Sequence, residues 1–313
     1  MLAYVIRRLF STIVVMAVVA FVVFLLLYLT PGDPAAILAG DAATVDDIRR
    51  IREKLGLDQP FVIRFGEWVW ALLRGDLGTS IFTNLPVTHL IAQRIEPTVA
   101  LTVCTLLVAV LVAVPLGVIA AAKAGTWIDR SVMGFTVLGF SLPVFVLAYI
   151  LIMVFSIELD WLPVQGYRPI SEGLWEWLRH LILPSIALGT VYMALIARIT
   201  RASMLDVLAQ DYIRTAQAKG LAPGAVLVGH ALKNAAVPIV TIIGIGIALL
   251  IGGAIVTETV FAIPGIGRLT VDAILRRDYP IIQGVILIFS GAYVLINLAV
   301  DLSYMFFDPR IRY

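Results

Sequence analysis

Long apolar runs recur along this chain, and polar residues gather between them. Lys, Arg and Glu occur in these runs only at their ends. A helix that crosses a bilayer needs roughly 20 mostly apolar residues, and each run meets this length. The pattern therefore predicts an all-α integral membrane protein with six transmembrane helices. The six runs are Leu9–Leu29, Thr98–Ala121, Val132–Ile157, Leu181–Ile199, Ala236–Val256 and Ile281–Phe306.

The segment between the first two runs, residues 31–97, has a different pattern that predicts two short amphipathic helices. One begins at Thr44 and ends at Gly56, and the other begins after Pro60 and ends at Gly75. Such helices suit either a membrane surface, with aromatics at the interface, or an external cap that docks a partner, and the pattern favours neither. The second helix places Phe61, Phe65, Trp68 and Leu72 on one face.

Basic residues beside the runs set the orientation, because short cytoplasmic loops carry an excess of Lys and Arg. Placing the N-terminus inside puts more basic residues on the cytoplasmic side, so both termini are expected to be cytoplasmic. The first run, Leu9–Leu29, is longer than the apolar region of about 7–15 residues in a signal peptide. We therefore expect it to remain as a membrane helix.

Composition agrees with a membrane protein. Of the 313 residues 61% are hydrophobic and 14% are charged, whereas soluble domains are about a quarter charged. A net charge of +2 gives no general basic field for nucleic acid. The single cysteine, Cys104, excludes an internal disulfide.

Motifs of catalysis are absent from the sequence. It contains no phosphate-binding G-x-x-x-x-G-K-[ST] loop, no H-E-x-x-H and no G-x-S-x-G, and its three histidines lie on different predicted loops without metal-ligand spacing. We therefore expect no catalytic residue and no metal site. Ion-coupled carriers usually need ionisable groups near the bilayer midplane, yet the middles of these runs offer only Ser, Thr, Tyr, Cys and Asn297. A transporter built this way needs energy from outside the chain.

Two runs carry small residues every four positions, which lets helix backbones approach closely in lipid. These positions are Ala109, Ala113, Gly117 and Ala121 in the second run and Gly244, Ala248 and Gly252 in the fifth. The pattern indicates a packed bundle or a subunit interface, although small residues are common in membrane helices in any case.

The predicted cytoplasmic loop at residues 200–235 carries the most informative pattern. A short helix is expected at about Asp211–Lys219, ending at Gly220, because glycine readily takes the left-handed conformation of a helix C-terminus. Such a helix, held between two spans, can be gripped by a soluble protein. A solvated positive loop that only fixes the orientation is the alternative.

At this loop the sequence resembles the permease subunits of binding-protein-dependent ATP-binding-cassette (ABC) importers. Their loop pattern, E-A-A-x-x-x-G, aligns with Arg214-Thr215-Ala216 and Gly220. Arg in place of Glu and Thr in place of Ala match the dipeptide and oligopeptide branch. The resemblance covers nearly the whole chain in order. Further matches are P-G-D-P at 31–34, L-G-L-D-Q-P at 55–60, R-G-D-L-G at 74–78, S-L-P at 141–143, T-E-T-V-F at 257–261, I-P-G-I-G-R at 263–268 and R-D-Y-P at 277–280.

The resemblance implies the fold of a type I ABC importer permease. It divides the chain into a first helix at 1–30, an external loop at 31–97, a five-helix core at 98–306 that contains the loop 200–235, and a tail at 307–313. It implies a non-catalytic subunit of a peptide importer in the bacterial inner membrane. The residues expected to contact an ATPase are Asp211, Tyr212, Arg214, Thr215, Ala216, Lys219 and Gly220.

The same resemblance implies the partners. A second, homologous permease would complete the pore, and two ABC ATPase subunits would bind ATP and Mg, so that this chain itself binds no cofactor. A solute-binding protein would dock on 31–97 and on the loops near Trp161 and Pro264, and lipid would surround the helices. The alternative is a stand-alone ion-coupled carrier or channel.

Four residues are candidates for lining a translocation path. Pro143, with Ser141, interrupts the third run, and a purely structural kink is the alternative. Glu258 lies at the outer end of the fifth run and could instead be an interfacial carboxylate. Asn297 lies in the last run.

Overall fold

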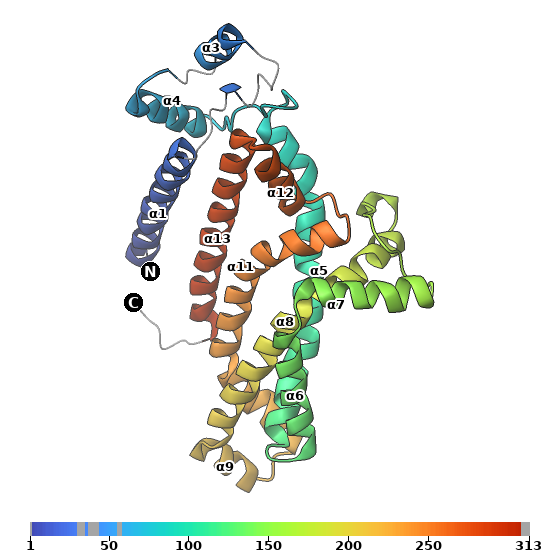
Figure 1. The fold of residues 1–313 in the computed structure, drawn as a ribbon. Helices are drawn as coiled ribbons and strands as arrows, with labels where there is room; N and C mark the ends of the chain where they lie inside the picture. The colour runs from blue at the N-terminus through green and yellow to red at the C-terminus, as the bar shows by residue number, and fades with distance from the viewer. Residues whose placement is uncertain (1, 30–34, 37–43, 55–57, 308–313) are drawn as a thin grey trace. The chain divides into compact units, whose positions relative to one another are not determined.

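The structure is a computed structural model that describes residues 2–29, 35–36, 44–54 and 58–307. Within these ranges the regular elements are helices, apart from one isolated β-bridge between Thr79 and Pro86 (Figure 1). This confirms the all-helical prediction. The predicted helix end at Gly56 and the tail 308–313 lie outside the described residues. The elements are α1 (Leu2–Leu29), α3 (Val45–Lys54), α4 (Phe61–Leu73), α5 (Val87–Ala122), α6 (Trp127–Ser141), α7 (Val144–Leu151), the π-helix η1 (Ile152–Glu158), the 3-10 helix η2 (Ile170–Glu172), α8 (Leu174–Leu208), α9 (Asp211–Ala218), α10 (Pro223–Ala225), the π-helix η3 (Val226–Leu232), α11 (Ala236–Val260), α12 (Ile266–Arg276) and α13 (Tyr279–Phe307).

The described residues hold three to five candidate membrane spans. Three helices are long and apolar enough by themselves: Val87–Ala122, Leu174–Leu208 and Tyr279–Asp301. Two bent pairs raise the number to five if each pair is one span: Trp127–Ser141 with Val144–Glu158, and Pro223–Leu232 with Ala236–Ile247. Helix α1 contains a shorter apolar stretch, Phe10–Leu25. The count of six stays a prediction.

The third predicted run is not one continuous helix, which corrects the sequence interpretation. Helices α6 and α7 meet at an angle of 104°. Proline has no N–H to donate and its ring excludes the helical conformation from the preceding residue. Leu142 is accordingly extended (φ −90°, ψ 122°), and Pro143 precedes the first turn of α7. Pro143 therefore breaks the helix where the sequence indicated only a kink.

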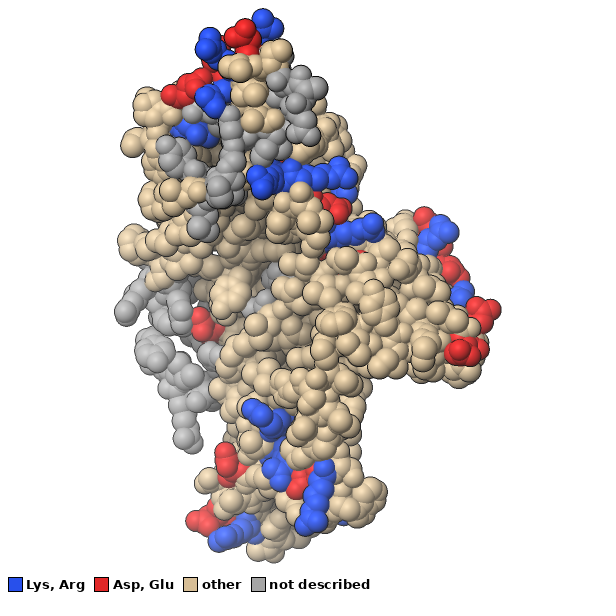
Figure 2. All heavy atoms as spheres, in the orientation of Figure 1, with Lys and Arg blue, Asp and Glu red and all other residues tan. Residues whose placement is uncertain are grey.

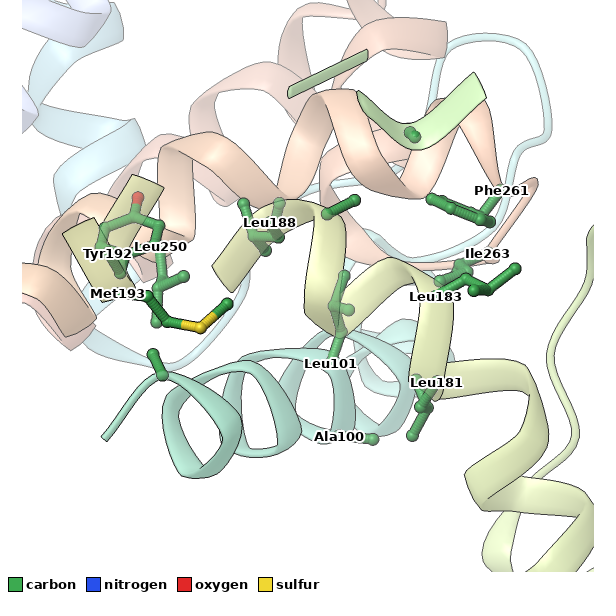
Figure 3. Close-up of a cluster of buried hydrophobic side chains, with 14 of the residues drawn as sticks. Ala100, Leu101, Leu181, Leu183, Leu188, Tyr192, Met193, Leu250, Phe261 and Ile263 are labelled. Carbon is green, nitrogen blue, oxygen red and sulfur yellow. The ribbon is translucent and has the colours of Figure 1, made fainter. Parts of the chain in front are cut away.

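The chain forms two compact units, Met1–Ile95 with Leu269–Val294 and Glu96–Arg268 with Leu295–Tyr313. Helix α8 is the centre of the second unit, because α6, α7 and α11 all pack against it. Its buried side chains join those of neighbouring elements in one apolar core (Figure 3). Leu101 of α5, Leu188 and Met193 of α8, and Leu250 of α11 lie in this core.

Helix α5 has two opposite faces within the second unit. One face is buried and the other is apolar yet exposed. An exposed apolar stripe along a long helix suits lipid, which can satisfy no polar group. The buried stripe contains Leu101, Thr105, Ala109 and Ala113, and the exposed stripe contains Val99, Val103, Leu107 and Leu111.

The small residues of α5 pack as predicted. Ala109, Ala113, Gly117 and Ala121 are all buried. A Cβ atom at Gly117 would lie 2.6 Å from the Cβ of Thr200 and 2.7 Å from the carbonyl oxygen of Ala197, so α5 and α8 touch through their backbones here. In α11 the two glycines differ, because Gly244 packs on Val300 whereas a Cβ atom at Gly252 would meet no other element of the described residues within 4 Å.

In the first unit, α4 begins after Pro60 and is followed by Gly75 with φ +79°, as the sequence predicts. Its aromatic face packs on α1, with the rings of Phe61, Phe65 and Trp68 centred 5.2–5.4 Å from that of Phe24. These rings thus lie against another helix of the same unit, where the sequence left a membrane interface or a docked partner open. Edge-to-face contacts of Phe24 with Phe61 and Phe65, and a tilted contact with Trp68, explain why this helix is held there.

Candidate functional site

Helix α9 occupies the position that the sequence predicts, because residues at both of its ends favour those boundaries. Gln210 is extended (ψ 147°), and Asp211 places a carboxylate in the first turn. At the other end Gly220 has φ +79° and donates its N–H to the carbonyl of Gln217 at 2.9 Å. Leu221 donates to the carbonyl of Ala216 at 3.3 Å, which completes the helix end.

One face of α9 is anchored in the protein. Ile213 is fully buried and Ala216 nearly so. They join an apolar cluster that contains Ala121 at the end of α5, Met204 of α8 and Val226 of η3. Helix α9 therefore packs against the ends of α5 and α8 and against η3. A displacement of α9 moves these contacting residues as well.

The other face of α9 is polar and open. Asp211, Tyr212, Arg214, Thr215 and Lys219 are exposed. Arg214 and Asp211 form an ion pair of 3.4 Å, but their side chains are 74% and 96% exposed, so the pair contributes little to stability. Figure 2 shows charged side chains gathered around α9 and, separately, around η1 and η2, with uncharged surface between them in this unit. All seven predicted coupling residues lie together here, with Ala216 on the buried side.

The predicted path residues are placed differently from one another. Ser141 and Pro143 are exposed at the break between α6 and α7, and the Ser141 hydroxyl donates to the carbonyl of Val137 at 2.9 Å. Asn297 is half-buried in α13. Glu258 is fully buried near the end of α11. No ligand contact tests a path role, which stays a prediction for all four.

The Glu258 carboxylate lies at the N-terminus of α12. Its Oε1 accepts the hydroxyl proton of Thr98 at 2.6 Å, and its Oε2 accepts the backbone N–H of Arg268 at 3.0 Å. The Thr98 oxygen in turn accepts the N–H of Ile266 at 2.8 Å. A carboxylate is favourable there, because the first N–H groups of a helix have no partner within the helix and carry partial positive charge. We call these four residues the Glu258 corner.

Two glycines make room for the Glu258 corner. A Cβ atom at Gly265 would overlap the Glu258 carboxyl group, and one at Gly267 would lie 2.7 Å from the Cα of Ile255. No pattern in the sequence predicted that Thr98, Ile266 or Arg268 would contact Glu258. The available signal was the G-I-G sequence at 265–267, which allows a buried group to approach the backbone closely.

A second polar group, also missed from the sequence, holds the loop between η1 and η2. Tyr167 donates its hydroxyl to Glu96 at 3.0 Å and accepts the indole N–H of Trp177 at 3.1 Å. Burial raises the pKa of Tyr167 to about 12, and the Glu96 carboxylate adds to this effect. Gly166 of the same loop donates to the carbonyl of Phe261 at 2.8 Å.

The described residues contain no group of three or more His, Cys, Asp or Glu that could hold a metal ion. His89, His180 and His230 lie in α5, α8 and η3, so the predicted placement on loops was wrong. His89 and His180 contact Gln93 and the carbonyl of Glu176, four residues away in each case.

Comparisons with known proteins agree with this architecture. Residues 113–313 match the family described as "Binding-protein-dependent transport system inner membrane component". Residues 1–102 match the family described as the N-terminal part of a binding-protein-dependent transport system membrane component.

Individual relatives match over the full chain. A probable peptide ABC transporter permease of Sinorhizobium fredii is 56% identical over 99% of both chains. A dipeptide transport system permease of Alkalihalophilus pseudofirmus is 43% identical, and a glutathione transport system permease of Salmonella choleraesuis 44%, each over 100% of both chains. Among solved structures, an inward-facing MetNI methionine ABC transporter chain has a TM-score of 0.59 at 18% identity, and the match covers 71% of this chain and 97% of that one. That likeness concerns the fold alone.

Proposed function

Because the chain belongs to the family of inner-membrane components of binding-protein-dependent transport systems, we propose that it forms half of the translocation pore of a peptide importer. As a permease subunit it is a non-catalytic membrane component. A second, homologous permease supplies the other half of the pore, and a solute-binding protein delivers the substrate from outside. Two ABC ATPase subunits bind ATP and Mg, and this chain binds neither.

The two faces of α9 carry the proposal. A coupling element has to be open to a soluble partner and firmly attached to the membrane helices. The polar face of α9, with Asp211, Tyr212 and Arg214, offers the first property, and buried Ile213 offers the second. We propose that the ATPase subunits grip this face and that ATP hydrolysis moves α9 together with the ends of α5 and α8.

We propose the six-span topology with both termini in the cytoplasm. In this arrangement α1 is a span of its own, and each bent pair crosses once. The core at 98–306 performs transport, and the first helix at 1–30, the external loop at 31–97 and the tail at 307–313 are segments outside this core. The excess of Lys and Arg beside the inner ends of the runs supports this orientation.

The substrate class is proposed from the relatives. Permeases named for peptides, dipeptides and glutathione are 43–56% identical to this chain over their full length. All three substrates are small molecules with peptide bonds, so we propose short peptides or similar solutes. Ser141, Pro143 and Asn297 are the proposed path residues. For Glu258, which is fully buried, we propose the positioning of the first residues of α12 in place of contact with substrate.

Purification from the native membrane tests this function. A tagged chain extracted in mild detergent is expected to carry two ATPase subunits and a second permease. The complete complex in liposomes should take up peptide only with ATP and the binding protein. Absence of any ATPase, together with uptake by this chain alone under an ion gradient, would instead establish the ion-coupled carrier.

A further inference from the structure

An ion pair between two helices lies in the second unit, close to α9. The Arg201 Nε donates to Oδ1 of Asp129 at 2.5 Å, and its Nη2 donates to Oδ2 at 2.7 Å. The Asp129 side chain is 6% exposed and that of Arg201 is 26% exposed. This two-point contact fixes the orientation of both side chains, because the guanidinium and carboxylate planes must align.

The backbone also holds Asp129 in place. Gly125, whose φ is +77°, donates its N–H to Oδ2 of Asp129 at 2.9 Å. The turn between α5 and α6 is thus tied to the same carboxylate. Both carboxylate oxygens are occupied, so Arg201 binds a group that is already positioned.

The pair differs from other ion pairs of the chain. Those of Arg168, Arg179 and Arg214 join residues three or four positions apart and are more exposed. Asp129 and Arg201 are 72 positions apart and connect α6 with α8. An exposed pair within one turn contributes little, whereas removing one partner of a buried pair leaves an uncompensated charge.

Helix α8 connects this pair to α9. Met204, three residues after Arg201, is fully buried in the cluster that holds Ile213 and Ala216 of α9. Thr200, beside Arg201, packs on Gly117 of α5. A displacement of α9 therefore reaches α8 at Met204 and reaches α6 through Arg201.

We propose that Asp129 and Arg201 are positioning residues that transmit motion of α9 to α6, and through α6 to the break at Ser141–Pro143. Helix α6 is fixed to α8 at its other end as well, where a Cβ atom at Gly139 would lie 3.2 Å from Ala194. With the ion pair in place α6 and α8 move as one body. Without it the first turn of α6 is released, and only the packing at Gly139 still passes movement of α8 to the break. This inference rests on the proposed function of α9.

The experiment uses the complete importer in liposomes and measures peptide taken up per ATP hydrolysed. Asp129→Asn and Arg201→Gln should each lower this ratio at least about fivefold, the lower end for coupling between two sites. Arg201→Lys, which keeps the charge and loses the two-point contact, should lower it less. The double exchange Asp129→Arg with Arg201→Asp should recover part of the ratio. Lys123→Gln, at an exposed cation in the turn before α6, serves as the matched control and should leave it unchanged.

The outcomes separate the possibilities. A ratio that stays at the wild-type value in the single variants, with only a lower yield or melting temperature of the complex, means a purely structural pair and overturns the proposal. If Asp129→Asn does not assemble, Arg201→Lys takes its place, and a wild-type ratio in that variant overturns the proposal. Absence of ATP-dependent uptake by the wild-type complex would refute the proposed function, because that result does not depend on the variants.

Discussion

Helix α9 and the Glu258 corner are two polar regions of the same unit with opposite arrangements. In the corner, the Glu258 carboxylate is buried and its hydrogen bonds come from Thr98 and Arg268 of the same chain. On α9, Asp211 and Arg214 are exposed and share only a loose ion pair. Polar groups that are satisfied internally stabilise the fold, and polar groups on an anchored but open face are available to a partner. The difference separates a structural site from an interaction site.

The largest expected effect comes from removing the buried carboxylate. Glu258→Leu leaves the Thr98 hydroxyl and the Arg268 N–H without their acceptor, and an unpaired buried group costs about 1–3 kcal/mol. We expect the free energy of unfolding to fall by roughly 3 kcal/mol or more, measured by denaturant unfolding in micelles. Glu158→Leu, at an exposed carboxylate, is the control. Equal stability of the two variants would remove the distinction between enclosed and open polar groups.

The two faces of α9 should respond in opposite ways. Ile213→Ala removes a fully buried side chain, and we expect a loss of about 2–3 kcal/mol in the free energy of unfolding. Tyr212→Ala, on the exposed face, should leave stability unchanged and lower peptide-stimulated ATP hydrolysis by the assembled complex. Unfolding and ATPase assays on the same preparations measure both quantities. Normal ATP hydrolysis by Tyr212→Ala would mean that this face is only solvated.

A smaller effect is expected from the glycine that makes room for the corner. The Cβ atom of Gly267→Ala would approach the Cα of Ile255 to 2.7 Å, and overpacking of this kind costs about 1–2 kcal/mol. Gly134→Ala in α6, where the new Cβ atom would meet no other element of the described residues within 4 Å, should be neutral or slightly stabilising. Thermal unfolding of both variants side by side is the measurement. A stable Gly267→Ala variant would show that the corner can shift without loss.

The smallest effect concerns the end of α9. Gly220 has φ +79°, a conformation that costs about 1 kcal/mol for a residue with a side chain. Gly220→Ala should lower the free energy of unfolding by that amount, whereas Gly224→Ala, whose Cβ atom would meet no other group of the described residues within 4 Å, should not. The difference in melting temperature between Gly220→Ala and Gly224→Ala measures the cost of the left-handed conformation at position 220. If it vanishes, the left-handed glycine is not what ends the helix.

Local signals predicted α9, and long-range contacts explain what the sequence did not reveal. Asp211 and Gly220 lie at the ends of the same helix, so their types alone indicated its boundaries. Pro143 indicated a disturbance of the third run, but the 104° angle depends on how α6 and α7 pack on α8. Glu258 meets Thr98, and Arg201 meets Asp129, across 160 and 72 positions of the chain. No periodicity within one helix reports such meetings, because they depend on how different helices pack.

Site-directed cross-linking in native membranes tests the central claim most directly. Cys104 is the only cysteine, so Cys104→Ser gives a background in which single cysteines can be placed at will. We expect Tyr212→Cys and Thr215→Cys to cross-link to an ATPase subunit, and Gln165→Cys, at an exposed position of the loop before η2, to form no such product. An importer that still takes up peptide while neither α9 position reaches an ATPase would contradict the account.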